Sequence, residues 1–226
     1  IRGRLAESPQ FQKIKDKKQE VKMPIIESIK QHPKEILLAM GARFAENGFF
    51  YIYAVFVMMY ATQALGMPRQ SILNGVMIAA TIEVFTIPAF GLLSDKIGRR
   101  PVYIFGAVFS AIMSFPLFYL MGTKVPYLGW IGIILGLAVG HAAMYGPQAS
   151  FLSEMFGTKV RYSGVSLGYN LASIFAGALS PLIGTWLLIT FKPETWPISV
   201  YMICLAMITV VAVFFAKESH KKSAEF

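Results

Sequence analysis

Cysteine and charged residues are scarce in this chain. Cys204 is its single cysteine, so neither a disulfide nor a cysteine-rich metal site can be built from this chain alone. Charged residues make up 15% of the 226 residues and apolar residues 55%, which leaves too little polar surface to cover a soluble domain of this size. The sequence also lacks metal-binding and phosphate-binding motifs, so we expect no metal, no cofactor and no enzymatic activity.

Long apolar runs dominate the sequence instead. Six of them reach the length of about 20 residues that a helix needs to cross roughly 30 Å of hydrocarbon. They lie at 36–63, 71–93, 101–122, 126–150, 163–190 and 196–216. The sequence therefore predicts an all-α membrane protein with six transmembrane helices over 36–216, followed by a tail at 217–226.

Lysine and arginine are distributed unevenly among the segments that flank these runs. They crowd the segment before the first run, the loops after the second and fourth runs, and the tail, whereas the other loops contain Arg69, Lys124 and Lys192. Because short basic loops stay in the cytoplasm, we expect a multi-pass protein of the cell (inner) membrane with both termini cytoplasmic. The net charge of +9 is then explained by basic segments that lie beside an anionic lipid leaflet. Nucleic-acid binding is not needed to explain it.

Residues 1–35 differ in composition from the rest of the chain. The stretch from Lys13 to Lys22 is a run of charges that we expect to be solvated. After Pro24, the sequence allows either a short amphipathic helix on the lipid headgroups or a plain linker. The chain begins with Ile1 rather than methionine and opens without a removable signal peptide, so we expect a piece of a longer protein.

Ionisable side chains inside the apolar runs are costly in lipid and are therefore candidates for function. Arg43 and Glu46 fall about 10 and 15 Å into the first span, and Asn47 shares their helical face. Glu83 and His141 fall near the middle of the second and fourth spans, so three helices bring polar groups to one depth. Arg43 suits a substrate carboxylate, and Glu46 or Glu83 suits a proton site.

Purely structural roles for these side chains remain open from the sequence. Arg43 could neutralise Glu46 within the helix, or it could extend toward the inner interface. His141 could simply join two helices through a hydrogen bond.

A polar island separates the second and third runs and reads Gly-Leu-Leu-Ser-Asp-Lys-Ile-Gly-Arg-Arg from Gly91 to Arg100. Gly98 permits the sharp reversal that two neighbouring spans need. With Gly91, Asp95, Gly98, Arg99 and Arg100 in register, the island resembles the signature loop of the major facilitator superfamily. In that family the loop lies between the second and third helices, and again between the eighth and ninth.

Two further blocks narrow the resemblance. Residues 152–172, including Glu154 and Arg161, resemble the loop between the tenth and eleventh helices of the metabolite:proton symporter group, which includes carriers of shikimate, 2-oxoglutarate, citrate, and proline or betaine. Residues 5–11 resemble the start of the superfamily's central loop. The resemblance implies the C-terminal six-helix bundle of a twelve-helix major facilitator fold, with two inverted three-helix repeats. It makes residues 1–35 the central cytoplasmic loop and an N-terminal six-helix half the partner.

The charged groups of the inner loops suggest a gate. We hypothesise that Asp95, Arg100, Glu154 and Arg161 form a cytoplasmic latch whose ion pairs differ between the inward-open and outward-open states. The alternative is that these residues only anchor helices at the membrane face.

The function implied by the resemblance is secondary active transport by alternating access. We expect proton-coupled symport of a small polar metabolite, an organic acid, across the lipid bilayer. Alternatives within transport are a uniporter and an osmolyte or amino-acid symporter for betaine or proline. An alternative of another class is a six-span structural or sensory membrane protein.

Overall fold

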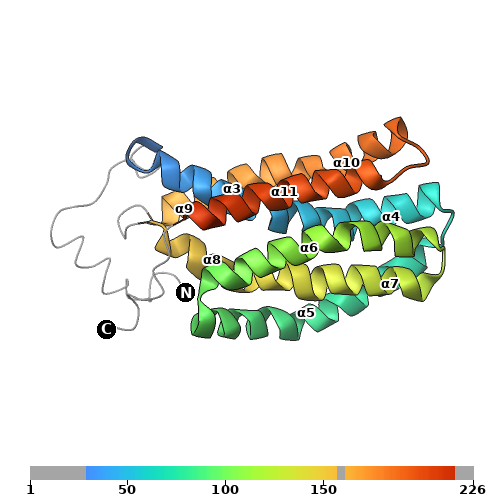
Figure 1. Ribbon diagram of the computed structural model, residues 1–226, viewed down its shortest axis with the longest axis horizontal. Coiled ribbons are helices and arrows are strands. Elements are labelled where there is room, and N and C mark those ends of the chain that lie inside the picture. The colour runs from blue at the N-terminus through green and yellow to red at the C-terminus, as the bar shows by residue number, and fades with distance from the viewer. Residues whose placement is uncertain (1–28, 157–160, 217–226) are drawn as a thin grey trace, which may run out of the picture.

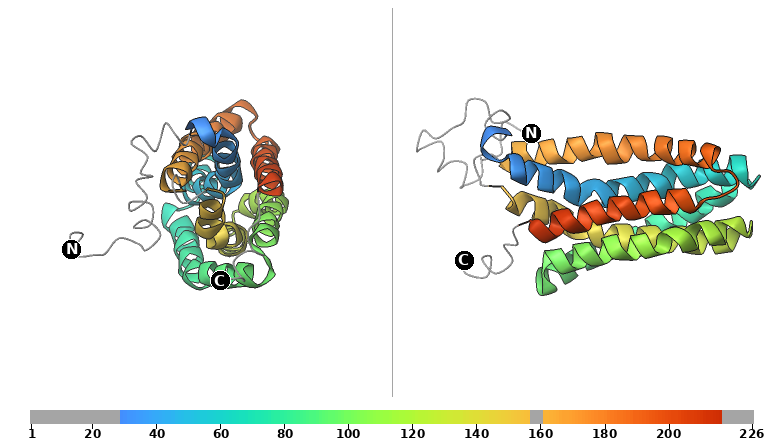
Figure 2. Two further views of the ribbon diagram at one scale, coloured as in Figure 1. Left: turned by 90° about the vertical axis from the view of Figure 1, so that its left-hand side faces the viewer. Right: turned by 45° about the horizontal axis from the view of Figure 1, so that its top comes forward.

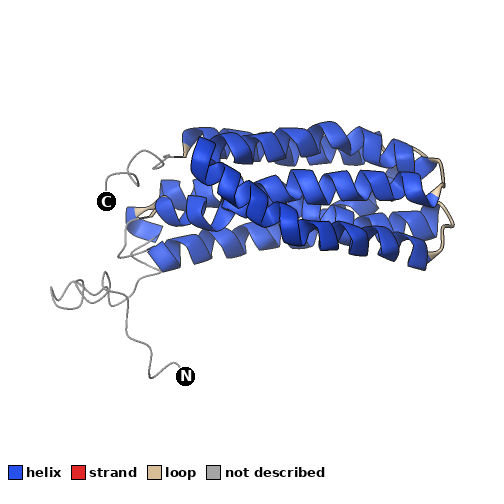
Figure 3. Cartoon of the chain, turned by 90° about the horizontal axis from the view of Figure 1, so that it is seen from below, coloured by secondary structure: helices blue, strands red, loops and turns tan. Residues whose placement is uncertain are grey.

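The computed structural model describes residues 29–156 and 161–216, which form a bundle of helices lying side by side (Figure 1). Six helices in this part of the chain are long and apolar enough to cross a membrane. They are Pro33–Ala64, Arg69–Ile97, Arg99–Gly122, Pro126–Glu154, Arg161–Thr190 and Trp196–Phe215. The prediction of an all-α protein with six spans is confirmed (Figure 3). Most of the predicted basic segment and the whole predicted tail lie outside the described residues.

Some spans are single α-helices and others contain π-helical turns. The single helices are α5 (Arg69–Ile97), α6 (Arg99–Gly122) and α11 (Trp196–Phe215). The first span joins α3 (Pro33–Tyr51), η2 (Ile52–Phe56), α4 (Val57–Met59) and η3 (Tyr60–Ala64). The fourth span joins α7 (Pro126–Leu135), η4 (Gly136–His141) and α8 (Ala142–Glu154). The fifth span joins α9 (Arg161–Ala172), η5 (Ser173–Ala178) and α10 (Leu179–Thr190). Because π-helical turns occur frequently at functional sites, η4 and η5 are places where a functional site is expected.

The polar island after the second run is mostly helical rather than a loop. Helix α5 continues through Asp95 to Ile97, and α6 begins at Arg99, so Gly98 alone connects them. Gly98 has a φ of 102°, a conformation that a residue with a Cβ resists. The sharp reversal predicted at Gly98 is therefore present, although the connection is shorter than the island suggested.

The connections alternate between the two ends of the bundle. At one end, on the left of Figure 1, lie the start of α3, the α5–α6 connection, the end of α8, the start of α9 and the end of α11. We call it the basic end, after Lys34, Lys96, Arg99, Arg100 and Arg161. The connections at 65–68, 123–125 and 191–195 lie at the opposite end. This alternation places the signature island and the Glu154 block at the same end.

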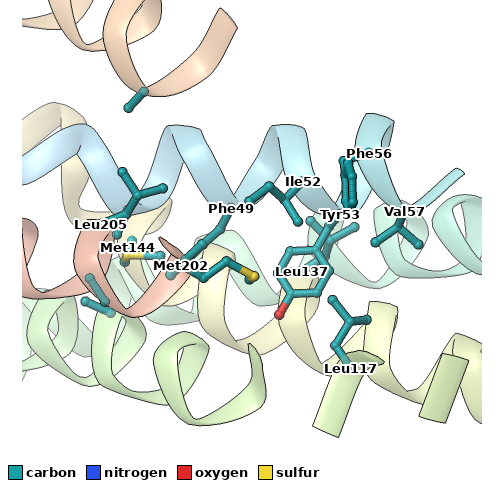
Figure 4. Packing of buried hydrophobic residues seen from close by; sticks show 14 of the residues in the cluster. Phe49, Ile52, Tyr53, Phe56, Val57, Leu117, Leu137, Met144, Met202 and Leu205 are labelled. Atoms are coloured by element: carbon teal, nitrogen blue, oxygen red, sulfur yellow. The ribbon is translucent and has the colours of Figure 1, made fainter. Parts of the chain in front are cut away.

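The first and fourth spans form the interior of the bundle. Their most apolar windows are each 61% buried, against 11% for α5. Helix α3 packs against α11 and α9, and the fourth span packs against α5 and α6 (Figure 2). Phe49, Tyr53 and Phe56 of the first span form the apolar core with Leu117 and Leu137 (Figure 4). The two best-buried spans therefore carry Arg43, Glu46 and His141 into the centre of the bundle.

Candidate functional site

The ionisable residues predicted from three separate spans meet in one buried cluster. Arg43 and Glu46 come from α3, Glu83 from α5 and His141 from the last position of η4. Their exposed fractions lie between 3% and 8%, so each charge is withdrawn from solvent. Burial of a charge is tolerated when it is paired and hydrogen-bonded, and these four side chains pair with one another.

His141 bridges the two carboxylates. Its Nδ1 lies 2.6 Å from Oε1 of Glu83, and its Nε2 lies 3.3 Å from Oε1 of Glu46. A neutral imidazole carries one N–H and can donate to only one of these oxygens. Both contacts become hydrogen bonds when the cluster holds one proton more than a neutral imidazole and two carboxylates. That proton can lie on the imidazole ring or on a carboxylate. The Glu46–His141–Glu83 triad thus has the chemistry of a site that holds an exchangeable proton.

Arg43 is held on several sides. Its Nε lies 3.1 Å from Oε2 of Glu46, and its Nη1 donates to the carbonyl oxygen of Tyr169 at 2.9 Å and to Oγ of Ser173 at 2.6 Å. The guanidinium carbon also lies 3.1 Å from the centroid of the Tyr169 ring. With its amide oxygen turned toward the guanidinium, Asn47 accepts from Nη1 at 2.8 Å. Arg43 therefore pairs with Glu46 on its own helix and also places its guanidinium beside Tyr169 and Ser173.

Sequence reasoning missed Gln148, which lies behind the carboxylate of Glu46. Its Nε2 donates to Oε2 of Glu46 at 2.8 Å, and a 3.0 Å contact joins the same nitrogen to the Tyr103 hydroxyl. Gln148 follows His141 by seven residues, so the two lie on the same side of the fourth span. A rule that included buried amides would have found it. No comparable signal in the sequence indicated Tyr169 or Ser173. Tyr169 contacts Arg43 through its carbonyl oxygen and its ring.

A cavity of about 470 Å³ opens onto the cluster. Arg43, Glu46, Asn47, Glu83 and His141 all line it, together with Tyr169 and Ser173. Phe50, Tyr51 and Tyr145 add further aromatic rings to its wall. The ring centroids of Phe50 and Tyr145 lie 5.2 and 5.3 Å from that of His141. The cavity is large enough for a small metabolite and combines a cation, two carboxylates joined by an imidazole, and aromatic rings.

Charged side chains of the signature island and of the Glu154 block meet at the basic end of the bundle. Arg99 forms an ion pair with Glu154 and lies 3.5 Å from the exposed Asp95. Arg100 instead donates to the carbonyl oxygen of Ala216, and Nε of Arg161 donates to the carbonyl oxygen of Phe156 at 3.4 Å. Consecutive helix residues point about 100° apart, so one of the two arginines after Gly98 faces α8 while the other faces α11. The ion pair that joins the two blocks is therefore Arg99–Glu154, and the state-dependent latch of Asp95, Arg100, Glu154 and Arg161 stays a prediction.

A six-helix membrane bundle with a charged, cavity-lining cluster is the architecture of one half of a major facilitator transporter. The chain matches the family described as "Sugar (and other) transporter" over residues 1–225. It belongs to this family of the major facilitator superfamily.

Several curated proteins resemble the chain along nearly its whole length. It is 30% identical over 225 residues to the shikimate transporter of Escherichia coli strain K12, covering 98% of the chain and 51% of that protein. It is 32% identical to the inner membrane metabolite transport protein YhjE of the same organism, covering 99% of the chain and 51% of the relative. It is 29% identical to the proline/betaine transporter of Salmonella typhimurium, covering 97% of the chain and 45% of that protein. The chain thus spans about half the length of these relatives, consistent with a C-terminal half. No solved structure matches it.

Proposed function

We propose that the chain is the C-terminal half of a proton-coupled symporter that moves a small organic acid by alternating access. The observation that carries the proposal is the contact of His141 with both Glu46 and Glu83, beside Arg43 and on the wall of one cavity. Such a triad accepts and releases a proton, and the guanidinium offers a fork for a carboxylate. The transport activity named for the three relatives above agrees with this role.

Charge balance explains how a proton and an anion would be coupled. Arg43 is neutralised by Glu46 when the cavity is empty, so a substrate carboxylate must compete with Glu46 for the guanidinium. Loading a further proton onto the triad of Glu46, His141 and Glu83 removes one negative charge from the cluster. Arg43 is then free to pair with the substrate, and the net charge buried in the cavity changes little. Neither the proton nor the anion binds well without the other.

The basic end supplies the gate in this proposal, with both termini cytoplasmic because of the positive charge gathered there. The Arg99–Glu154 ion pair fastens the start of α6 to the end of α8, and its breakage would accompany a change of state. Asp95, Arg100 and Arg161 flank this pair. The N-terminal half would cover the exposed faces of α5 and α9–η5 and form the other wall of the pathway. Residues 1–226 alone are therefore expected to bind substrate weakly and to transport none.

The test uses the full-length transporter, with both halves, reconstituted into liposomes. Uptake is measured for a panel of labelled organic acids and zwitterions, with and without an inward proton gradient. We expect the gradient to drive accumulation of at least one acid, and Glu83→Gln to abolish accumulation while exchange of substrate persists. Glu35→Gln is the matched control, because Glu35 pairs with His32 outside the cavity. Accumulation by Glu83→Gln equal to that of the wild type would overturn the proposal.

The second candidate is a symporter for a zwitterion, and the proline/betaine relative favours it. A zwitterion has an ammonium for Glu46 as well as a carboxylate for Arg43, so the cluster would need no additional proton for charge balance. Accumulation of betaine or proline, rather than of an acid, would select this alternative. Equal uptake with and without the proton gradient would select a uniporter instead. A structural or sensory role would leave every substrate in the panel untransported.

A further inference from the structure

Thr209 of α11 makes an unusual pair of hydrogen bonds to the backbone of α3. Its Oγ1 accepts from the amide nitrogen of Ala45 at 2.8 Å and donates to the carbonyl oxygen of Gly41 at 2.9 Å. The side chain is fully buried in a largely apolar helix. Both bonding directions of the hydroxyl are thus used on one turn of a neighbouring helix.

In a regular α-helix the amide of Ala45 and the carbonyl of Gly41 bond to each other. The hydroxyl of Thr209 contacts both of these groups, so two hydrogen bonds tie α11 to this turn of α3. The close approach is possible because residue 41 is glycine. A Cβ there would lie 2.9 Å from Cβ of Ala212, which is one turn after Thr209 on α11.

The bridged turn is the one that carries the charged cluster. Arg43 lies between Gly41 and Ala45, and Glu46 follows at once. The rotation of this turn decides how far Arg43 reaches toward α9 and η5, and how closely Glu46 approaches His141. We infer that Thr209 is a positioning residue: by bridging Gly41 and Ala45, it sets the orientation of Arg43 and Glu46. The inference rests on the proposed function in one respect, that this orientation matters for coupling.

Other buried hydroxyls of the bundle do not share this arrangement. Ser199, also on α11, donates to the carbonyl oxygen of Ser114 at 3.1 Å and contacts a single backbone group. Ser180 contacts the Tyr201 hydroxyl and a carbonyl of its own helix. Neither serine hydroxyl contacts both the amide and the carbonyl of one turn of a neighbouring helix, as Thr209 does. Ser199 therefore provides a matched control on the same helix, away from the cluster.

The experiment follows the protonation of the cluster through the stability of the full-length transporter. The charged and titratable groups of the triad and of its surroundings are Arg43, Glu46 and Tyr51 of α3, Glu83 of α5, His141 of η4, Tyr103 of α6, Tyr145 of α8 and Tyr169 of α9. The melting temperature in detergent is measured across pH for the wild type and for Thr209→Val, Thr209→Ser and Ser199→Ala. Glu83→Gln identifies the transition that belongs to the cluster.

We expect Thr209→Val, which keeps the shape but loses the hydroxyl, to shift the midpoint of that transition by about half a pH unit, the scale of one altered hydrogen bond. Thr209→Ser retains the wild-type midpoint, and Ser199→Ala lowers the melting temperature without moving the midpoint. A wild-type midpoint in Thr209→Val, or an equal shift in Ser199→Ala, overturns the inference. This readout needs no transport, so a failure of the proposed function appears separately, as uptake by the wild type that ignores the proton gradient.

Discussion

Nδ1 of His141 lies 2.6 Å from Oε1 of Glu83, and this contact joins η4 to α5 in the middle of the bundle. The same imidazole reaches Glu46 of α3 through its other nitrogen. One side chain therefore connects three spans, and each connection depends on where the proton resides. A change of protonation is in this way also a change in how the helices are held together.

Replacing His141 by glutamine should destabilise the transporter. Glu83 loses its buried partner, and an unsatisfied buried polar group costs about 1–3 kcal/mol. The effect is measured as a lower melting temperature in detergent at neutral pH. His32→Gln serves as the control, since His32 is half-buried and contacts Glu35 at 3.8 Å outside the cluster. Equal losses for the two variants would mean that the contacts of His141 contribute little.

Arg43→Lys should weaken substrate binding more than it lowers the maximal rate. The guanidinium contacts Glu46, Tyr169 and Ser173 together, which a single ammonium cannot reproduce with the same geometry. Loss of one charge-assisted contact of about 1.4 kcal/mol corresponds to a tenfold rise in KM for uptake. Arg69→Lys, at an exposed position on α5, should leave KM unchanged. An unchanged KM in Arg43→Lys would remove Arg43 from the substrate site.

Gly146→Ala should push α5 and α8 apart. A Cβ at residue 146 would lie 2.7 Å from the carbonyl oxygen of Ile87 and 2.8 Å from the amide nitrogen of Gly91, and neither backbone atom can move aside easily. Overpacking of this kind costs about 1–3 kcal/mol. Because α5 carries Glu83, the variant should also reduce proton-driven uptake. Gly122→Ala, where a Cβ would meet nothing within 4 Å, is the control for stability and uptake.

The Arg99–Glu154 pair should matter more than the contact of Arg99 with Asp95. The Asp95 side chain is 60% exposed, whereas those of Arg99 and Glu154 are 16% and 22% exposed. Arg99→Glu should therefore lower stability by about 1–2 kcal/mol, and Asp95→Asn by less than about 0.5 kcal/mol. The double variant Arg99→Glu with Glu154→Arg should recover part of the loss. Thermal unfolding measures all three, and a double variant no better than the single one would argue against a direct pair.

The sequence was sufficient for the number of spans and for the depth of the charged groups. Length and hydropathy limit where a helix can cross a membrane, and the cost of a buried charge points to Arg43, Glu46, Glu83 and His141. Helix rotation was harder to predict. The π-helical turns η4 and η5 shift the faces of their spans, and no residue pattern identified them in advance.

Individual contacts depended on that rotation. Arg99 and Arg100 point about 100° apart around α6, and it is Arg99 that forms the ion pair with Glu154. Charge alone does not predict which of the two arginines faces Glu154. The bridge from Thr209 to the α3 backbone was invisible for a different reason. A single threonine in an apolar run is common, and its partners are main-chain atoms of a distant segment.

The central claim is that the Glu46–His141–Glu83 triad carries the proton that accompanies the substrate. The most direct measurement follows external pH in lightly buffered liposomes containing the full-length transporter while substrate is added outside. The account predicts that the wild type and His32→Gln take up protons in step with substrate. It also predicts that His141→Gln exchanges substrate without moving protons. Proton uptake by His141→Gln at the wild-type ratio to substrate would contradict it.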